Sequence, residues 1–116
     1  LARFYREAAM IVTPSIWYEG FPGVVIEAMR HSRPVIVSDI GGLPELVASG
    51  QAGMLAPPGD DAALAQAITG LLADNDARRA LGEAGFAHVK SQYTYDLYYE
   101  RLMATYRQAV ASRVAA

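Results

Sequence analysis

The sequence contains no cysteine, and this absence excludes several kinds of site. Disulfide bonds, thiolate metal sites and cysteine nucleophiles are all ruled out. Histidine is scarce as well. The two histidines, His31 and His88, lie far apart in the sequence and form no spaced pair of metal ligands. No apolar run approaches the roughly 20 residues that a membrane-spanning helix needs.

Positive and negative charges are nearly balanced. Ten Lys and Arg residues stand against twelve Asp and Glu residues, which gives a formal net charge of −2. The chain therefore has no broad electrostatic reason to bind nucleic acid or an anionic membrane, and we expect no nucleic-acid partner. Charged residues interrupt the opening residues 1–6, so they do not form a secretory signal, and a cytoplasmic location is expected.

Apolar residues, by contrast, are plentiful. They make up 53% of the 116 residues, which is enough for a packed core and excludes intrinsic disorder on composition. The length fits about one small domain. The chain opens with Leu1 rather than Met, within a segment that has the pattern of a helix. We therefore expect it to be a fragment of a longer protein.

Three short apolar segments, residues 10–13, 35–38 and 54–56, are predicted to be strands. Helical patterns lie before, between and after them, over residues 1–8, 23–31, 43–47, the segment after Asp60, 77–90 and a long segment after Thr94. Strands separated by helices imply right-handed crossovers and a parallel sheet. The predicted fold class is α/β, with about three parallel strands, flanking helices and a long C-terminal helix. We expect a further strand on the open side of the first one.

Local residues predict where several helices begin and end. Asp60 and Thr94 are suitable N-caps for the helices that follow them. The segment 74–76 is predicted to separate two helices, and Gly82 and Gly85 weaken the prediction for 77–90.

The segment from Glu19 to Glu27 joins a predicted strand to a predicted helix and is the candidate site. In open α/β sheets, ligands bind beyond the carboxyl ends of the strands. A helix N-terminus there offers free N–H groups and a positive dipole end to a phosphate, and Gly20 and Gly23 would let the backbone approach a ligand. The two carboxylates can accept hydrogen bonds from ribose or sugar hydroxyls. On spacing alone, however, two glutamates placed like this are usually two solvated side chains.

Further motifs stand at fixed distances from this segment: residues 12–15, the Glu pair with seven residues between its members, 34–39, 41–45, 58–59 and Leu64. Together they resemble the C-terminal, donor-binding domain of the retaining glycosyltransferases with the GT-B fold, of the group 1 or family 4 type. The resemblance runs from about residue 8 to residue 110. It implies that residues 1–116 form part of a Rossmann-like nucleotide-sugar-binding domain, whose upstream half and acceptor domain are absent.

The resemblance also implies a role for each residue of the motif, although it assigns no catalytic residue. The donor sugar would contact Glu19, Gly20, Phe21 and Gly23, and the nucleotide would contact Val24 and Glu27. The donor would be a UDP-, GDP- or ADP-sugar, with no other cofactor. No metal is expected, because cations and the helix dipole take its place. Gly41 and Gly42 would shape the crevice, and Glu45 would start a helix rather than bind a ligand.

The implied activity of the full-length protein is transfer of a hexose-type sugar to an acceptor hydroxyl, in bacterial glycan or glycolipid synthesis. A sugar or lipid-linked acceptor would bind the missing N-terminal domain, in the cytoplasm or at the inner face of the membrane. The fragment alone is expected to be inactive. Two alternatives remain: a non-catalytic α/β binding or interaction module and, more distantly, a nucleotide-sugar 2-epimerase of similar architecture.

Some residues depart from the family pattern or stay ambiguous. Pro22 stands where Gly is frequent and removes one N–H donor. Ser32 stands where Gly usually ends the helix, so a left-handed cap there would cost more. Trp17 and Tyr18 would either line the crevice or pack the strand-to-helix turn.

The last helix has an apolar stripe rich in tyrosine, which includes Tyr98, Tyr106 and Val110. In the resembling fold this helix packs on the N-terminal domain. Without that domain we expect part of the stripe to be exposed and the isolated chain to self-associate.

Overall fold

The computed structural model describes residues 1–115 and contains one sheet of three parallel strands. The strands are β1 (Ile11–Thr13), β2 (Val35–Ser38) and β3 (Met54–Ala56), in the order β1-β2-β3. Ile36 lies opposite Val12 on one side and Met54 on the other. The predicted parallel sheet is therefore confirmed, with strand bounds within one residue of those expected.

Helices precede, connect and follow the strands. They are α1 (Ala2–Glu7), α2 (Gly23–Arg30), α3 (Leu43–Leu46), the 3-10 helix η1 (Ala48–Gly50), α4 (Asp61–Ala73), α5 (Asn75–Gln92) and α6 (Tyr95–Ala115). None of the described helices combines the length and the apolar character needed to cross a membrane.

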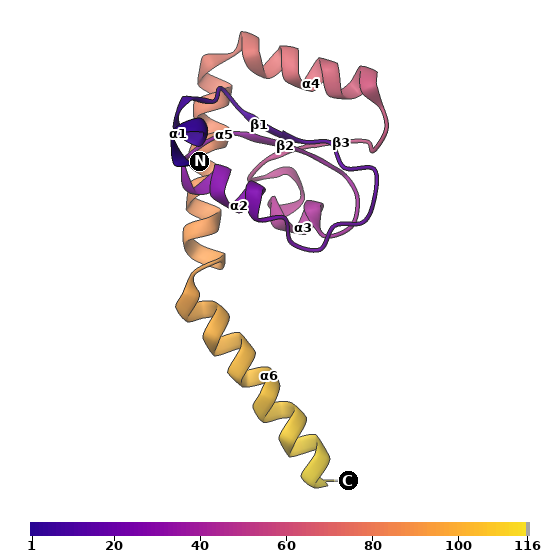
Figure 1. Cartoon of the computed structure of the whole chain (residues 1–116), viewed down its shortest axis with the longest axis vertical. Coiled ribbons are helices and arrows are strands. Elements are labelled where there is room, and N and C mark those ends of the chain that lie inside the picture. The colour runs from indigo at the N-terminus through magenta and orange to yellow at the C-terminus, as the bar shows by residue number, and fades with distance from the viewer. Residues whose placement is uncertain (116) are drawn as a thin grey trace.

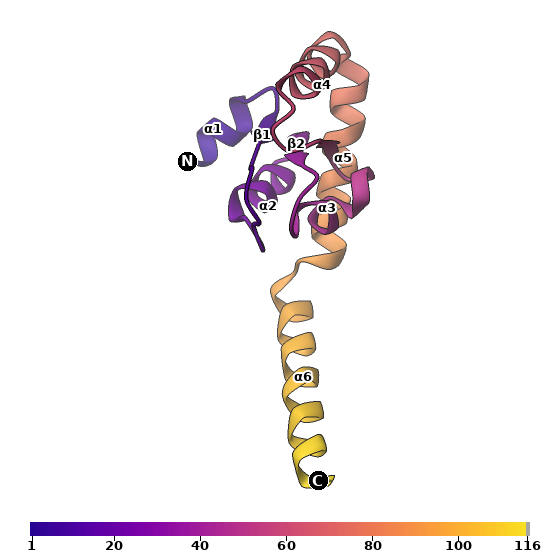
Figure 2. The same cartoon turned by 90° about the vertical axis from the view of Figure 1, so that its right-hand side faces the viewer.

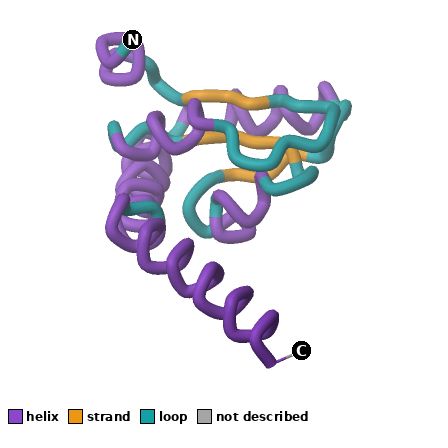
Figure 3. Tube along the Cα trace, turned by 60° about the horizontal axis from the view of Figure 1, so that its bottom comes forward, coloured by secondary structure: helices purple, strands orange, loops and turns teal. Residues whose placement is uncertain are grey.

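The sheet is covered on both faces, with α2 and α3 on one and α4 on the other (Figures 1, 2 and 3). Side chains alternate along β2, so Val35 and Val37 join the core on the α2 side while Ile36 joins the core on the α4 side. All four residues of β2 are buried. This two-sided burial explains why β2 is an unbroken apolar run rather than an alternating one.

The helix ends follow the predicted signals, with one correction. The side chains of Asp60 and Thr94 accept hydrogen bonds from the backbone of Ala63 (2.9 Å) and Leu97 (3.2 Å), as expected. Residues 74–76, however, do not form a break. Asp74 alone ends α4 and caps α5 by accepting from the backbone N–H of Ala77 at 2.9 Å, so α5 begins at residue 75 instead of 77.

The glycines of α5 mark close packing rather than weakness. A Cβ atom added to Gly82 would lie 2.2 Å from the carbonyl oxygen of Ser32. Ser32 itself has a φ of 54°, which is the left-handed conformation expected after the end of α2. The absence of a side chain at Gly82 therefore lets α5 approach the turn between α2 and β2.

The long C-terminal helix α6 extends away from the rest of the chain (Figures 1 and 2). It has no buried residue, and Tyr98, Tyr106 and Val110 are each more than half exposed. The expected exposure of its apolar stripe is confirmed. Self-association through this stripe stays a prediction.

Candidate functional site

Two loops that follow neighbouring strands pack against each other through their backbones. The N–H of Gly42 donates a hydrogen bond to the carbonyl oxygen of Glu19 at 2.8 Å. A Cβ atom on Gly42 would lie 2.2 Å from the carbonyl oxygen of Gly20, and one on Gly41 would lie 2.8 Å from that of Glu19. The predicted shaping role of Gly41 and Gly42 thus has a direct cause, since no side chain fits between the loops.

A residue just beyond the end of β1 orients the carboxylate of Glu19. The Oγ of Ser15, a buried residue just beyond β1, donates a hydrogen bond to Oε1 of Glu19. Glu19 itself is only half-buried. Its side chain is therefore oriented by the sheet while part of it remains accessible to a ligand.

The N-terminus of α2 directly follows this loop and can bind an anion. Pro22 occupies the N-cap position without capping the helix through a side chain, and the first turn contains no acidic residue. The first amides of a helix lack intrahelical partners, and the helix dipole is positive at this end. Cβ atoms placed on Gly20 or Gly23 would meet nothing within 4 Å, so the space beside this end is open. Hydroxyl-bearing and anionic groups could both be accommodated here.

Glu27 lies one turn into α2, on the helix surface. Its Oε1 accepts a hydrogen bond from Nη1 of Arg30 at 3.3 Å, and both side chains are roughly half exposed. Exposed ion pairs of this kind contribute little stability. The Glu27 carboxylate can therefore exchange Arg30 for a ligand hydroxyl at small cost.

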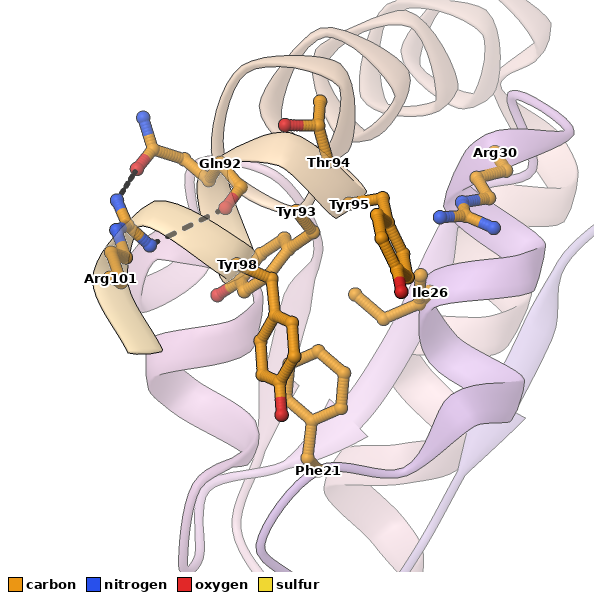
Figure 4. A pocket seen from close by; sticks show the side chains of 9 residues that line it. All are labelled: Phe21, Ile26, Arg30, Gln92, Tyr93, Thr94, Tyr95, Tyr98 and Arg101. Atoms are coloured by element: carbon orange, nitrogen blue, oxygen red, sulfur yellow. Dashed lines mark hydrogen bonds between the residues drawn. The ribbon is translucent and has the colours of Figure 1, made fainter. Parts of the chain in front are cut away.

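Phe21 contacts a part of the chain that sequence reasoning missed. Its ring lies 5.3 Å from that of Tyr93, at an interplanar angle of 60°. Both line a groove of ≈ 440 Å³ between α2 and the junction of α5 and α6, together with Ile26, Tyr98 and Arg101 (Figure 4). Tyr93 stands 72 positions after Phe21, and only the fold brings the two together.

Burial raises the pKa of the Tyr93 hydroxyl above 10.0, its ordinary value. The negative charge of Glu45 adds to this rise in pKa, whereas the positive charge of Arg101 opposes it. The shift therefore matters only at alkaline pH, since a tyrosine of ordinary pKa is already neutral at physiological pH.

Trp17 and Tyr18 precede Glu19 in the same loop. Their side chains are 64% and 84% exposed, so the interpretation that they pack the strand-to-helix turn is wrong. That they line the crevice stays a prediction. Among residues 1–115, no group of three or more His, Asp or Glu residues could hold a metal ion.

The family model described as "Glycosyl transferases group 1" matches residues 1–74, which include both loops and α2. The chain belongs to the group 1 glycosyltransferases. D-inositol 3-phosphate glycosyltransferase of Segniliparus rotundus is 36% identical over 110 residues, which are 95% of this chain and 24% of that protein. Alpha-maltose-1-phosphate synthase of Mycolicibacterium smegmatis is 34% identical over 110 residues, with 90% of this chain and 28% of that protein covered.

Solved structures share the fold of this chain. Sucrose-phosphate synthase from Thermosynechococcus elongatus superposes with a TM-score of 0.82 and 39% identity, over 94% of this chain and 27% of that one. Alr3699/HepE of Anabaena, solved in complex with UDP-glucose, gives a TM-score of 0.83 at 24% identity, over 91% of this chain and 29% of that one. The expected GT-B relationship is confirmed.

Membership of the group 1 glycosyltransferases does not favour a non-catalytic module, and none of the relatives named above is an epimerase. The chain spans about a quarter of the length of the curated relatives it matches. This member of the group 1 glycosyltransferases thus corresponds to one part of much longer proteins.

Proposed function

We propose that this chain forms the nucleotide-sugar-binding part of a retaining glycosyltransferase, which transfers a hexose-type sugar to an acceptor hydroxyl. One observation carries the proposal. The loop of residues 14–22, here named the donor loop, presents the Ser15-oriented carboxylate of Glu19 immediately before the open, uncapped N-terminus of α2. Groups that suit a sugar and a diphosphate therefore lie next to each other, in a chain of the glycosyltransferase family.

The residues have distinct roles in this proposal. The donor sugar is bound by the Glu19 carboxylate and the backbone of Gly20, Phe21 and Gly23. The nucleotide is bound by the remaining two residues, Val24 through its amide near the diphosphate and Glu27 through hydrogen bonds to the ribose hydroxyls. The open space beside Gly20 and Gly23 supports this arrangement.

The chemistry follows from the charge that develops at the leaving group. The bond between the sugar's anomeric carbon and the diphosphate breaks, and an oxocarbenium-like centre develops. The acceptor hydroxyl attacks from the same face, and its proton passes to the departing diphosphate. The N-terminus of α2 stabilises the negative charge on the departing diphosphate. Glu19 and Glu27 act as binding groups rather than as an acid and base pair.

The donor is a UDP-, GDP- or ADP-sugar. HepE, which shares this fold over 29% of its chain, was solved in complex with UDP-glucose, and this makes UDP-glucose the first donor to test. A sugar or lipid-linked acceptor binds a domain outside this chain, in the cytoplasm or at the inner face of the membrane. We expect no transfer by residues 1–116 alone.

Titration of the isotope-labelled chain with UDP-, GDP- and ADP-sugars, followed by two-dimensional amide NMR, tests the proposal. We expect one nucleotide to shift the signals of residues 20–27, and Glu27→Ala to abolish these shifts. Glu83→Ala, which removes an exposed carboxylate from α5, is the matched control and should leave them unchanged. Equal shifts in the two variants would contradict the role of Glu27. The absence of shifts with all three donors would contradict donor binding by this chain.

A further inference from the structure

We propose that Tyr93, at the joint between α5 and α6, is a positioning residue for the donor loop and links the direction of α6 to the donor-sugar site. The joint consists of residues 92–95. This inference rests on the proposed function of the donor loop, because it concerns how that loop is held.

The first step is a row of three rings that runs from the donor loop into α5. The Phe21 and Tyr93 ring centroids are 5.3 Å apart, and those of Tyr93 and His88 are 5.5 Å apart, both in edge-on geometries. Such arrangements match the electrostatics of aromatic rings and fix their relative orientation. Tyr93 is therefore held between a residue of the donor loop and a residue of α5.

The second step is the small number of contacts that fix the donor loop. The backbone of Glu19 is anchored by Gly42, and its side chain by Ser15. The backbone of Gly20 also packs against Gly42, but Gly20 is otherwise exposed, with open space where a Cβ would be. Phe21 is 60% exposed, and its ring packs edge-on against that of Tyr93. Tyr93 is thus placed to hold the part of the loop between the Glu19 anchor and α2.

The third step is the attachment of α6 at the same joint. Nη1 and Nη2 of Arg101, on the second turn of α6, donate hydrogen bonds to the backbone oxygen (3.4 Å) and the side-chain Oε1 (3.1 Å) of Gln92 (Figure 4). Thr94 caps the helix on the other side of Tyr93. Since α6 has no buried residue, its direction is set at this joint. Any contact that turns α6 must act on Gln92 to Thr94, and hence on the Tyr93 ring.

Fluorine NMR on the full chain labelled with 4-fluorophenylalanine tests the link between Tyr93 and the donor loop without any ligand, because the chemical shift of Phe21 reports on its surroundings. The label reports on Phe4, Phe21 and Phe86, and Phe21→Leu assigns the signal of Phe21. We expect Tyr93→Ala to move the Phe21 signal, Tyr93→Phe to preserve it, and the Phe4 signal to stay in place throughout. An unmoved Phe21 signal in Tyr93→Ala would overturn the proposal.

Two further variants separate positioning from loss of stability. Leu71→Ala weakens the core on the α4 side of the sheet, away from the joint, and should leave the Phe21 signal unmoved. Arg101→Ala removes two exposed hydrogen bonds and a positive charge that lines the groove, and it should fold normally, yet shift the Phe21 signal in the same direction as Tyr93→Ala. A Phe21 signal that responds to Leu71→Ala as it does to Tyr93→Ala would indicate a merely structural role.

Donor binding supplies the functional readout. We expect Tyr93→Ala to lower the affinity for the bound nucleotide sugar about two- to tenfold, with Tyr93→Phe restoring it. If the wild-type chain binds no nucleotide sugar, the proposed function fails, and the fluorine spectra still decide whether the joint holds the loop. If the wild type binds and Tyr93→Ala binds equally well, the proposed function stands and the positioning role is wrong.

Discussion

Helices α4 and α6 both carry an apolar stripe at helical spacing, but only one of the stripes is covered. In α4, Leu71 is buried and Leu64 and Ile68 pack against the sheet beside Ile36. In α6 no residue is buried, and the helix extends away from the body of the molecule (Figure 2). A periodic stripe therefore predicts a helix and the face it would bury. It does not predict whether the chain itself supplies a surface to bury that face against.

The largest expected difference between the two helices is in how much their apolar residues contribute to the free energy of unfolding. Leu71→Ala should lower the free energy of unfolding by about 2–5 kcal/mol, because it removes buried methyl groups and leaves a cavity. Val110→Ala, at a position 63% exposed on the stripe of α6, should change it by less than about 0.5 kcal/mol. Urea denaturation of both variants measures the difference. A comparable loss in Val110→Ala would show that the stripe of α6 is covered in solution.

Glycine substitutions extend the comparison from α4 to the donor loop. Gly42→Ala should destabilise the chain by about 1–3 kcal/mol, because its Cβ would collide with the carbonyl oxygen of Gly20. Gly70→Ala, in α4, meets nothing within 4 Å and should stabilise the chain by about 0.5–1 kcal/mol. Thermal denaturation of the two variants tests the signs, and the same sign for both would contradict the tight packing of the two loops.

Amide hydrogen exchange tests the comparison at the level of local opening. Amides of α6 should exchange at least about tenfold faster than those of α4, because α6 lacks the tertiary contacts that stabilise helices in proteins. Repeating the measurement at several protein concentrations tests the predicted self-association. Protection of α6 that grows with protein concentration would support self-association. Slow exchange of α6 at every concentration would contradict the view that α6 lacks stabilising tertiary contacts.

The smallest effect concerns the pH dependence of stability at the α5–α6 joint. Burial raises the pKa of Tyr93, so the folded chain retains this proton at a pH where the unfolded chain has lost it. The stability that this difference in pKa contributes is fully present below pH 10.0, the ordinary pKa of tyrosine. It is lost as the pH rises through the higher pKa of the folded chain. Tyr93→Phe should remove this loss. Urea titrations between about pH 8 and about pH 11 measure it, and identical pH profiles for both chains would contradict the prediction.

Most of the predictions that were correct rest on interactions between residues close together in the sequence. Each of the three strands is a short apolar run with a proline directly beside it, and the caps at Asp60 and Thr94 act within three residues of their partners. Such short-range signals are present in the sequence whatever the rest of the chain does. The wrong start of α5 arose where three polar residues in a row suggested a longer break than the single cap at Asp74 needs.

The contacts that could not be predicted join residues far apart in the chain. Nothing around Phe21 indicates that its ring partner is Tyr93, since that pairing depends on how α5 packs against α2. Likewise, the low helix propensity of glycine can be read from the sequence, but the packing of Gly82 against Ser32 cannot, because that contact exists only in the folded chain. The roles of the donor-loop residues came from a family resemblance, and they stay predictions until a donor is titrated.

The glycine contact between the two loops has a consequence for protein engineering. Because Gly41 and Gly42 touch the backbone of Glu19 and Gly20 directly, the two loops cannot be varied independently. A mutant library that randomises the donor loop while also varying residues 41 and 42 would consist mainly of misfolded chains. A library that keeps both glycines fixed and varies only exposed positions such as Trp17, Tyr18 and Val24 would sample new surfaces on an intact framework.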